Sequence, residues 1–232
     1  MHSSHTPNWF NIAAHTLPWG FCFYFFFVTF SDPGQMALYV AKDHVEGGGL
    51  VERLTVIVLV PGIIAAIYAL IRYRQKMTSA LASTWLLLWI LACIYFAGEE
   101  ISWGQWIFEW QTPESISRLN DQNETNFHNT STWLDQKPRT LVELWIFFAG
   151  TILPLISLFQ RNPYQKNWQY WIHPVSSMVS AGLFFTVVRI SGWIEIPEFE
   201  DLFGSSEFRE LSIAVFLSLF LLSFYARLRN TV

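Results

Sequence analysis

Hydrophobic positions along the chain gather into six long runs separated by polar segments. Each run, with its aromatic flanks, approaches the roughly 20 apolar residues that an α-helix needs to cross a bilayer. The runs cover residues 10–30, 54–71, 78–98, 141–159, 174–194 and 211–226. The fifth run is the least regular, because Arg189 interrupts it. The pattern predicts an all-α, polytopic transmembrane bundle of about six helices, with residues 1–232 forming a single integral membrane domain.

Lys and Arg are unevenly distributed among the polar segments. Basic residues follow the second, fourth and sixth runs, at Arg72, Arg74, Lys76, Arg161, Lys166, Arg227 and Arg229. Most Asp and Glu residues lie in the opposite loops, although some Lys and Arg occur there too. Because short cytoplasmic loops are enriched in Lys and Arg, this distribution predicts that both termini are cytoplasmic.

Composition supports the membrane assignment. The chain is 52% hydrophobic and only 14% charged, whereas soluble proteins average about 25% charged residues. The net charge of −4 is small and no basic stretch occurs, so we expect no nucleic-acid partner. Cys22 and Cys93 both lie inside apolar runs and are interpreted as buried small hydrophobes. The first run lacks the features of a cleaved signal peptide, so we expect it to be retained.

The largest polar insertion, residues 101–138, lies between the third and fourth predicted helices. Its first part is too apolar for a solvated loop, with Trp103, Trp106, Ile107, Phe108 and Trp110 close together. Trp prefers the depth of the lipid headgroups, so we expect an amphipathic helix in the interface. Pro113 suits the first turn of a second short helix, with Thr112 as its N-cap. We therefore predict a small extracytoplasmic interfacial subdomain.

Glu99 and Glu100 stand side by side where the third predicted helix leaves the hydrocarbon. Adjacent carboxylates at this depth are costly unless they pair, bind a metal or move protons. One interpretation places both in water at the helix end. The other buries at least one of them against the bundle, where the small residues Gly98, Ser102 and Gly104 would allow helices to approach closely. Neighbours on a helix point about 100° apart, so only one should face a given cavity.

His128 is the histidine nearest to this pair in the downstream sequence. Glu124 precedes it by four residues, and Asn126 can hydrogen-bond its ring. Glu100, Glu124 and His128 would form an oxygen-plus-imidazole set compatible with a divalent metal such as zinc, iron or manganese. The spacing matches no established metal motif, and a structural role for His128 stays open.

Arg189 is the third candidate, because an arginine inside a membrane segment requires a partner. We expect either an ion pair with Glu99, Glu100 or Glu195, or a contact with an anionic headgroup. Other outer acids are explained by the favourable dipole at helix N-termini. They are Glu52, Glu143, Glu207 and Glu210.

Three segments carry a resemblance to a known family: residues 98–105 (GEEISWGQ), 112–114 (TPE) and 124–129 (ETNFHN). Together with residues 50–55, they resemble a family of bacterial polytopic membrane proteins. The resemblance implies a bacterial inner-membrane location but supplies no reaction. Glu99-Glu100 also looks like the start of the first motif of the CAAX-protease superfamily of intramembrane glutamate enzymes. There an arginine follows the second glutamate by four residues, whereas this chain has Gly104 at that position, and the further histidine motifs are missing.

Two functions follow as hypotheses. The first is a hydrolase or transferase acting on a lipid or lipid-linked substrate, with Glu99, Glu100 and His128 as catalytic groups and Arg189, Asn126 and Trp103 as substrate contacts. The second is a non-catalytic subunit that binds membrane lipids or a membrane-protein partner. The first requires His128 to lie within about 8 Å of a glutamate, so that one water or metal can bridge them, and Arg189 within roughly 10 Å of that centre.

Overall fold

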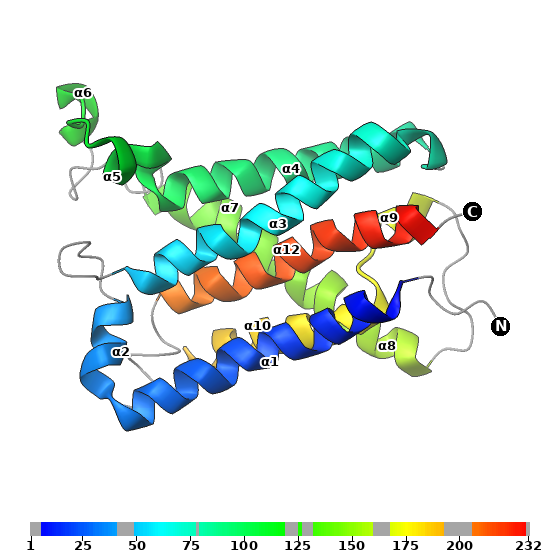
Figure 1. Ribbon diagram of the computed structural model, residues 1–232, viewed down its shortest axis with the longest axis horizontal. Coiled ribbons are helices and arrows are strands. Elements are labelled where there is room, and N and C mark those ends of the chain that lie inside the picture. The colour runs from blue at the N-terminus through cyan, green and yellow to red at the C-terminus, as the bar shows by residue number, and fades with distance from the viewer. Residues whose placement is uncertain are drawn as a thin grey trace.

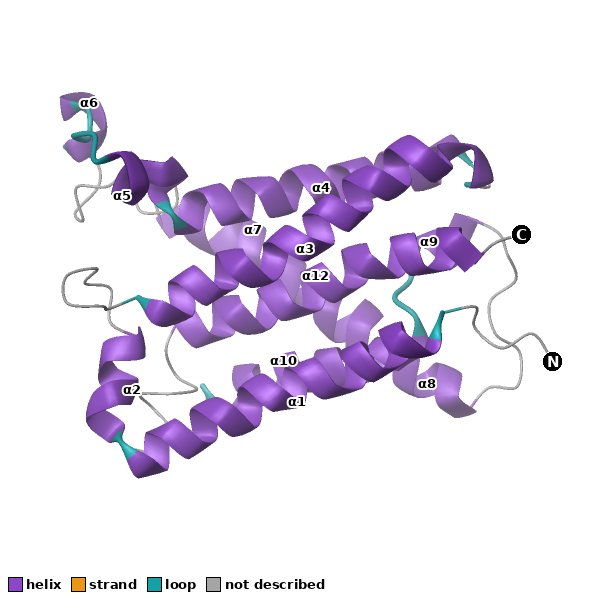
Figure 2. Cartoon of the chain, in the orientation of Figure 1, coloured by secondary structure: helices purple, strands orange, loops and turns teal. Residues whose placement is uncertain are grey.

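The computed structural model describes residues 6–40, 49–77, 79–118, 125–126, 132–159, 168–192 and 206–230. These residues form helices and no strand, as Figures 1 and 2 show. Six of the helical segments are long and apolar enough to cross a membrane. They are Asn8–Ser31, Leu50–Lys76, Ala80–Glu100, Lys137–Ser157, Tyr170–Ser191 and Ser206–Asn230. The prediction of an all-α, multi-pass membrane bundle is therefore confirmed.

Four of the spans are built on single α-helices. These are α1 (Asn8–Ser31), α3 (Leu50–Tyr73), α4 (Ala80–Glu100) and α12 (Ser206–Asn230). Local sequence fixes two of their starts. Ser79 caps α4, because its hydroxyl accepts a hydrogen bond from the Ala82 N–H at 3.3 Å. Gly49 precedes α3 with φ = 69°, a left-handed conformation that glycine adopts without a steric penalty.

The fourth and fifth spans are irregular. The fourth runs through α7 (Thr132–Trp145), a π-helical stretch (Ile146–Ile152) and α8 (Leu153–Phe159). In the fifth, α9 (Trp168–Ile172) ends just before Pro174, and α10 (Val179–Ser191) follows a short 3₁₀ turn. Proline disfavours helical geometry in the residue before it, which accounts for this break.

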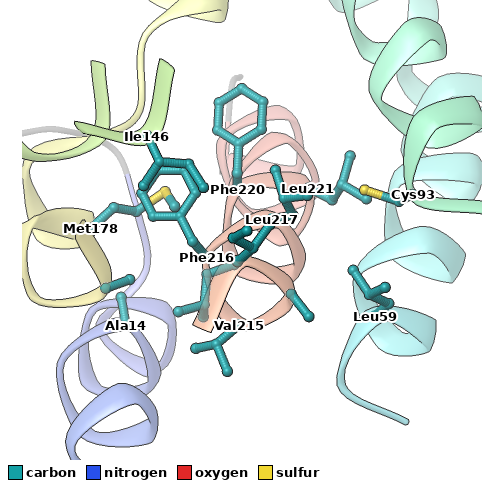
Figure 3. Packing of buried hydrophobic residues seen from close by; sticks show 14 of the residues in the cluster. Ala14, Leu59, Cys93, Ile146, Met178, Val215, Phe216, Leu217, Phe220 and Leu221 are labelled. Carbon is teal, nitrogen blue, oxygen red and sulfur yellow. The ribbon is translucent and has the colours of Figure 1, made fainter. Parts of the chain in front are cut away.

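Helix α12 occupies the centre of the bundle. Its apolar window is 89% buried, against 28% to 50% for the other five spans. In Figure 1, α12 runs between α3 and α10. Figure 3 shows its side chains packed among residues from the surrounding helices. The labelled members of this core are Ala14, Leu59, Cys93, Ile146, Met178, Val215, Phe216, Leu217, Phe220 and Leu221.

Small residues let the helices approach closely around α12. A Cβ added at Gly62 of α3 would lie 2.7 Å from the backbone of Ser218 in α12. A Cβ at Gly182 of α10 would lie 2.3 Å from the carbonyl oxygen of Gly150. Close backbone approach is how membrane helices gain packing energy, since lipid tails are as apolar as their side chains.

Charge divides the two ends of the bundle. The first residues of α1 and the last of α12 lie at one end, which Figure 1 places on the right. Arg72, Arg74 and Lys76, which close the second span, lie there too. The opposite end holds the end of α4 and the start of α12, with Glu99, Glu100, Glu207 and Glu210. We refer to these as the basic end and the acidic end.

The segment after α4 consists of short helical turns and not of one continuous interfacial helix. It begins with a 3₁₀ turn (Ser102–Gly104), followed by α5 (Gln105–Phe108) and α6 (Glu114–Ser117), each one turn long. The expected amphipathic helix is therefore wrong, because Trp103, Gly104 and Glu109 have positive φ and interrupt the helical geometry on both sides of α5. Thr112 does not cap α6; it accepts a hydrogen bond from Gln105 Nε2 at 3.0 Å. α7 already begins at Thr132, inside the segment 101–138.

Candidate functional site

A cavity of about 170 Å³ lies at the acidic end, between α4, α7 and α12. Two of its lining residues on α4, Ala92 and Tyr95, are exposed, so the cavity opens on the outward face of that helix. Four charged residues, Glu99, Glu100, Arg139 and Glu210, contribute to the wall. The rest of the wall is apolar or aromatic. It consists of Trp89, Ala92, Tyr95, Phe96, Pro138, Val142, Ile213 and Leu217.

Glu100 is the last residue of α4 and is only 6% exposed. Glu207 and Glu210 stand three residues apart in the first turns of α12, on the same side of that helix. One carboxylate oxygen from each of the three residues lies within 4.8 Å of the other two. The fold thus brings Glu100 to two acids that lie more than a hundred positions further along the sequence.

Glu99 is also buried, at 3% exposed, but its environment differs. Its Oε1 accepts a hydrogen bond from the indole N–H of Trp103 at 2.6 Å. The Trp103 ring packs against Gly98, where an added Cβ would lie 2.9 Å from the ring. Gly98 therefore makes room for this ring, and the expectation that it admits a neighbouring helix is wrong. Both glutamates line the cavity, contrary to the expectation that only one would face it.

Three arginines are placed among the acids. Arg139 of α7 donates to Glu210 Oε1 at 2.8 Å. Glu143, one helical turn further along α7, is the partner of two others. Arg189 of α10 donates to Glu143 Oε2 at 3.1 Å, and Arg209 Nε lies 3.4 Å from Glu143 Oε1. These pairs connect α7, α10 and α12 near the cavity.

Arg189 therefore finds a partner that the sequence analysis assigned to another role. We expected Glu99, Glu100 or Glu195, and explained Glu143 by the dipole of a helix start. Glu143 instead lies in the last part of α7, well inside the helix, because α7 begins at Thr132. Glu195 lies outside the described residues.

Residues 125–126 lie beside the turn that follows α4. Asn126 is 2% exposed, and its Nδ2 donates to the hydroxyl of Ser102 at 3.2 Å. The backbone N–H of Thr125 donates to Gln105 Oε1 at 2.6 Å. These contacts bring residues 125–126 back beside the turn that follows Glu100. His128 and Glu124, which complete the predicted metal set, lie outside the described residues, so their distances to the glutamates stay predictions.

The sequence analysis missed the acids on α12. Glu207 and Glu210 were explained as helix-start residues, and that explanation still fits their position. The available signal was their three-residue spacing, which places both carboxylates on one side of a helix. No local pattern indicated that this side would meet the end of α4.

Comparison with protein families, curated proteins and solved structures gives no match. The resemblance to a bacterial membrane family therefore stays an expectation. The site has to be interpreted from its own chemistry. It combines an apolar cavity open on one side, several carboxylates that can hold a cation or a proton, and a guanidinium that suits an anionic group.

Proposed function

We propose that the protein binds a lipid or lipid-linked substrate in this cavity and acts on it as a hydrolase or transferase. The observation that carries the proposal is an apolar cavity that opens on the outward face of α4 and ends in charged groups. A substrate chain would lie among residues such as Phe96, Ile213 and Leu217. Its polar head would then reach Glu100, Glu210 and Arg139.

The direction of entry supports a substrate that resides in the membrane. Ala92 and Tyr95 line the cavity and are exposed on α4, a helix whose outward face also carries Leu88 and Leu91, each 54% exposed. In a bilayer this face would contact acyl chains. A substrate could thus move sideways from the lipid into the cavity without leaving the hydrocarbon.

The polar end of the cavity suits a reaction at a headgroup. A guanidinium presents a planar fork that matches phosphate or carboxylate, and Arg139 is held in place by Glu210. The neighbouring carboxylates are of the kind that position or activate a nucleophile by accepting its proton or by holding a metal. We propose that both termini lie in the cytoplasm, since short cytoplasmic loops are enriched in Lys and Arg, and this chemistry would then occur at the outer leaflet of the inner membrane.

Blocking the cavity tests the proposal directly. Ala92→Trp places a large ring in the opening, whereas Leu91→Trp adds a similar ring at the adjacent position, which is also exposed but does not line the cavity. Lipid that co-purifies with the protein would be quantified by native mass spectrometry from nanodiscs. We expect wild type and Leu91→Trp to retain bound lipid and Ala92→Trp to lose most of it. Equal retention by both variants would contradict the proposal.

Turnover is the second requirement. A mixture of fluorescent phospholipids and lipid-linked phosphates in mixed micelles would be incubated with each variant, and released headgroups would be measured. Headgroup release by Leu91→Trp but not by Ala92→Trp is the expected result.

The rival function is that of a non-catalytic subunit, and one observation favours it. Ile107 and Phe108, beyond the end of α4, are 67% and 74% exposed. Such residues could pack on a partner membrane protein. Bound lipid without turnover, together with a stoichiometric partner lost in Phe108→Ser, would favour this rival.

A further inference from the structure

The acidic cluster contains one carboxylate whose burial is not explained by a hydrogen bond or ion pair to any described residue. Glu100 is only 6% exposed, yet it forms no hydrogen bond and no ion pair with the residues that the structure describes. Glu99, its neighbour, accepts the Trp103 N–H and so has a clear structural role. Burying a carboxylate without a partner is costly. The side chain of Glu100 instead points into the group formed with Glu207 and Glu210.

The charges around Glu100 are unbalanced. Glu52, Glu207 and Glu210 all lie near enough to repel its carboxylate, whereas Arg139 attracts it. Arg189 and Arg209 form ion pairs with Glu143, and Arg209 is also close enough to attract Glu210. When ionised, the carboxylates around Glu100 carry more charge than the neighbouring arginines balance, and a divalent cation would offset this excess.

The geometry also fits a cation. The three carboxylate oxygens all lie within 4.8 Å of one another. Two oxygens on opposite sides of one Ca²⁺ are separated by about 4.6 to 5.2 Å, and across Mg²⁺ by about 4.0 to 4.2 Å. Arg139 engages one oxygen of Glu210, and Ser206 donates to one oxygen of Glu207 at 3.1 Å. Since a carboxylate has about four lone-pair sites, both residues keep the capacity to bind a metal.

We propose that Glu100, Glu207 and Glu210 bind a hard divalent cation, such as Mg²⁺, Mn²⁺ or Ca²⁺. The ligand set consists only of oxygen atoms, which these ions prefer over the softer transition metals. It shares only Glu100 with the set of Glu100, Glu124 and His128 predicted from the sequence. The cation site is inferred from its geometry alone. Its role in binding a lipid headgroup rests on the proposed function.

A manganese titration tests the site without any substrate. The purified protein would be placed in nanodiscs of zwitterionic phosphatidylcholine, and free Mn²⁺ would be followed by electron paramagnetic resonance. We expect one saturable Mn²⁺ per chain, displaced by Mg²⁺ or Ca²⁺. Glu100→Gln and Glu207→Gln should each weaken binding by at least about tenfold, because even the loss of an outer-shell partner has this effect.

The control is Glu114→Gln, which removes an acid from α6 whose side chain is 81% exposed and paired with Arg118. It should bind Mn²⁺ like the wild type. Circular dichroism and size-exclusion profiles would show which variants fold. Should Glu100→Gln fail to fold, Glu207→Gln decides the matter, because Glu207 is partly exposed in the first turn of α12.

Two results would overturn the proposal: no saturable Mn²⁺ binding by the wild type, or unchanged binding in the folded Gln variants. The cation site and the lipid site fail separately. Ala92→Trp fills the cavity opening but leaves all three ligands in place. Mn²⁺ binding that persists in this variant while lipid is lost would support both proposals, and lipid binding with no Mn²⁺ binding would remove only the cation.

Discussion

Each end of the bundle buries a charged side chain. The one at the basic end is surrounded by groups that stabilise its charge, whereas the one at the acidic end lies among groups of the same charge. At the basic end, Arg227 of α12 is 0% exposed. Its guanidinium donates to the carbonyl of Tyr170 and to the carbonyl and hydroxyl of Ser223. The rings of Tyr170, Trp171 and Phe224 surround it, with centroids 4.7 to 5.2 Å away. These hydrogen bonds and ring contacts stabilise the guanidinium charge and offset the cost of burying it.

At the acidic end, Glu100 is buried almost as deeply but lies among other carboxylates and beside a cavity. A buried polar group with a full set of partners fixes the structure around it. One that lacks them lowers stability and is kept only where it does something else. The contrast indicates that Arg227 holds α9 against α12, and it agrees with our proposal that Glu100 belongs to a binding site.

The largest expected effect comes from removing the Arg227 charge. Arg227→Met keeps an unbranched chain but loses the hydrogen bonds and leaves the Tyr170 carbonyl without its donor. We expect a loss of about 3 kcal/mol in the free energy of unfolding, since hydrogen bonds to charged groups contribute about 1.5 to 3 kcal/mol each. Reversible unfolding in bicelles would measure it.

The matched control is Arg229→Met, two residues further along α12. Arg229 is exposed and donates to the Tyr225 hydroxyl at 3.2 Å. Its replacement should change stability by less than about 0.5 kcal/mol. If the two substitutions lowered the free energy of unfolding equally, the buried contacts of Arg227 would contribute no more to stability than the exposed contact of Arg229.

The helix contact between the two ends gives the next effect. Gly62→Ala forces a methyl group to within 2.7 Å of the Ser218 backbone. We expect a destabilisation of about 2 kcal/mol, typical of overpacking in a well-packed core. Gly20→Ala in α1 is the control, because an added Cβ there would meet nothing within 4 Å. Thermal unfolding of both variants would measure the difference. If Gly62→Ala were as stable as Gly20→Ala, the close contact with Ser218 would not limit the size of residue 62.

Trp103→Phe sharpens the contrast between Glu99 and Glu100. It keeps a ring against Gly98 but removes the N–H that Glu99 accepts at 2.6 Å. The expected loss is about 1.5 kcal/mol. Trp110→Phe removes a comparable N–H, but one directed to Thr125 at an exposed site, and should cost about 0.5 kcal/mol or less. Both values can be read from chemical unfolding in mixed micelles, and the reverse order would show that Glu99 does not depend on Trp103.

The smallest effect has the opposite sign. Glu100→Gln removes a charge that its neighbours repel. With a chelator present, it should therefore raise the free energy of unfolding by about 1 kcal/mol, since substitutions that relieve strain at functional sites commonly stabilise by this amount. Glu99→Gln should instead destabilise, because it weakens the acceptor for Trp103. Thermal melts with chelator and then with excess Mg²⁺ would test the pair. A destabilised Glu100→Gln in chelator would mean that Glu100 supports the fold as Glu99 does.

The acidic end shows which site residues the sequence could reveal. Glu99 and Glu100 were recognisable because they end an apolar run, and Asn126 because it lies in the polar insertion close to His128 in the sequence. Arg139, Glu207 and Glu210 carried no such signal. Glu207 and Glu210 lie near a helix start, and the helix dipole gives their position an ordinary explanation that hid the part they play with Glu100.

The sequence by itself determined the six spans, their order and the charge difference between the two ends, because hydrophobic length and the placement of basic residues act within single segments. It did not determine which helix lies at the centre or which charges meet. In a bilayer every span is apolar, so hydrophobicity does not select partners among the helices. Only the tertiary structure decided these points: Gly62 admits α12 at its contact with Ser218, and the central position of α12 brings Glu207 and Glu210 to Glu100.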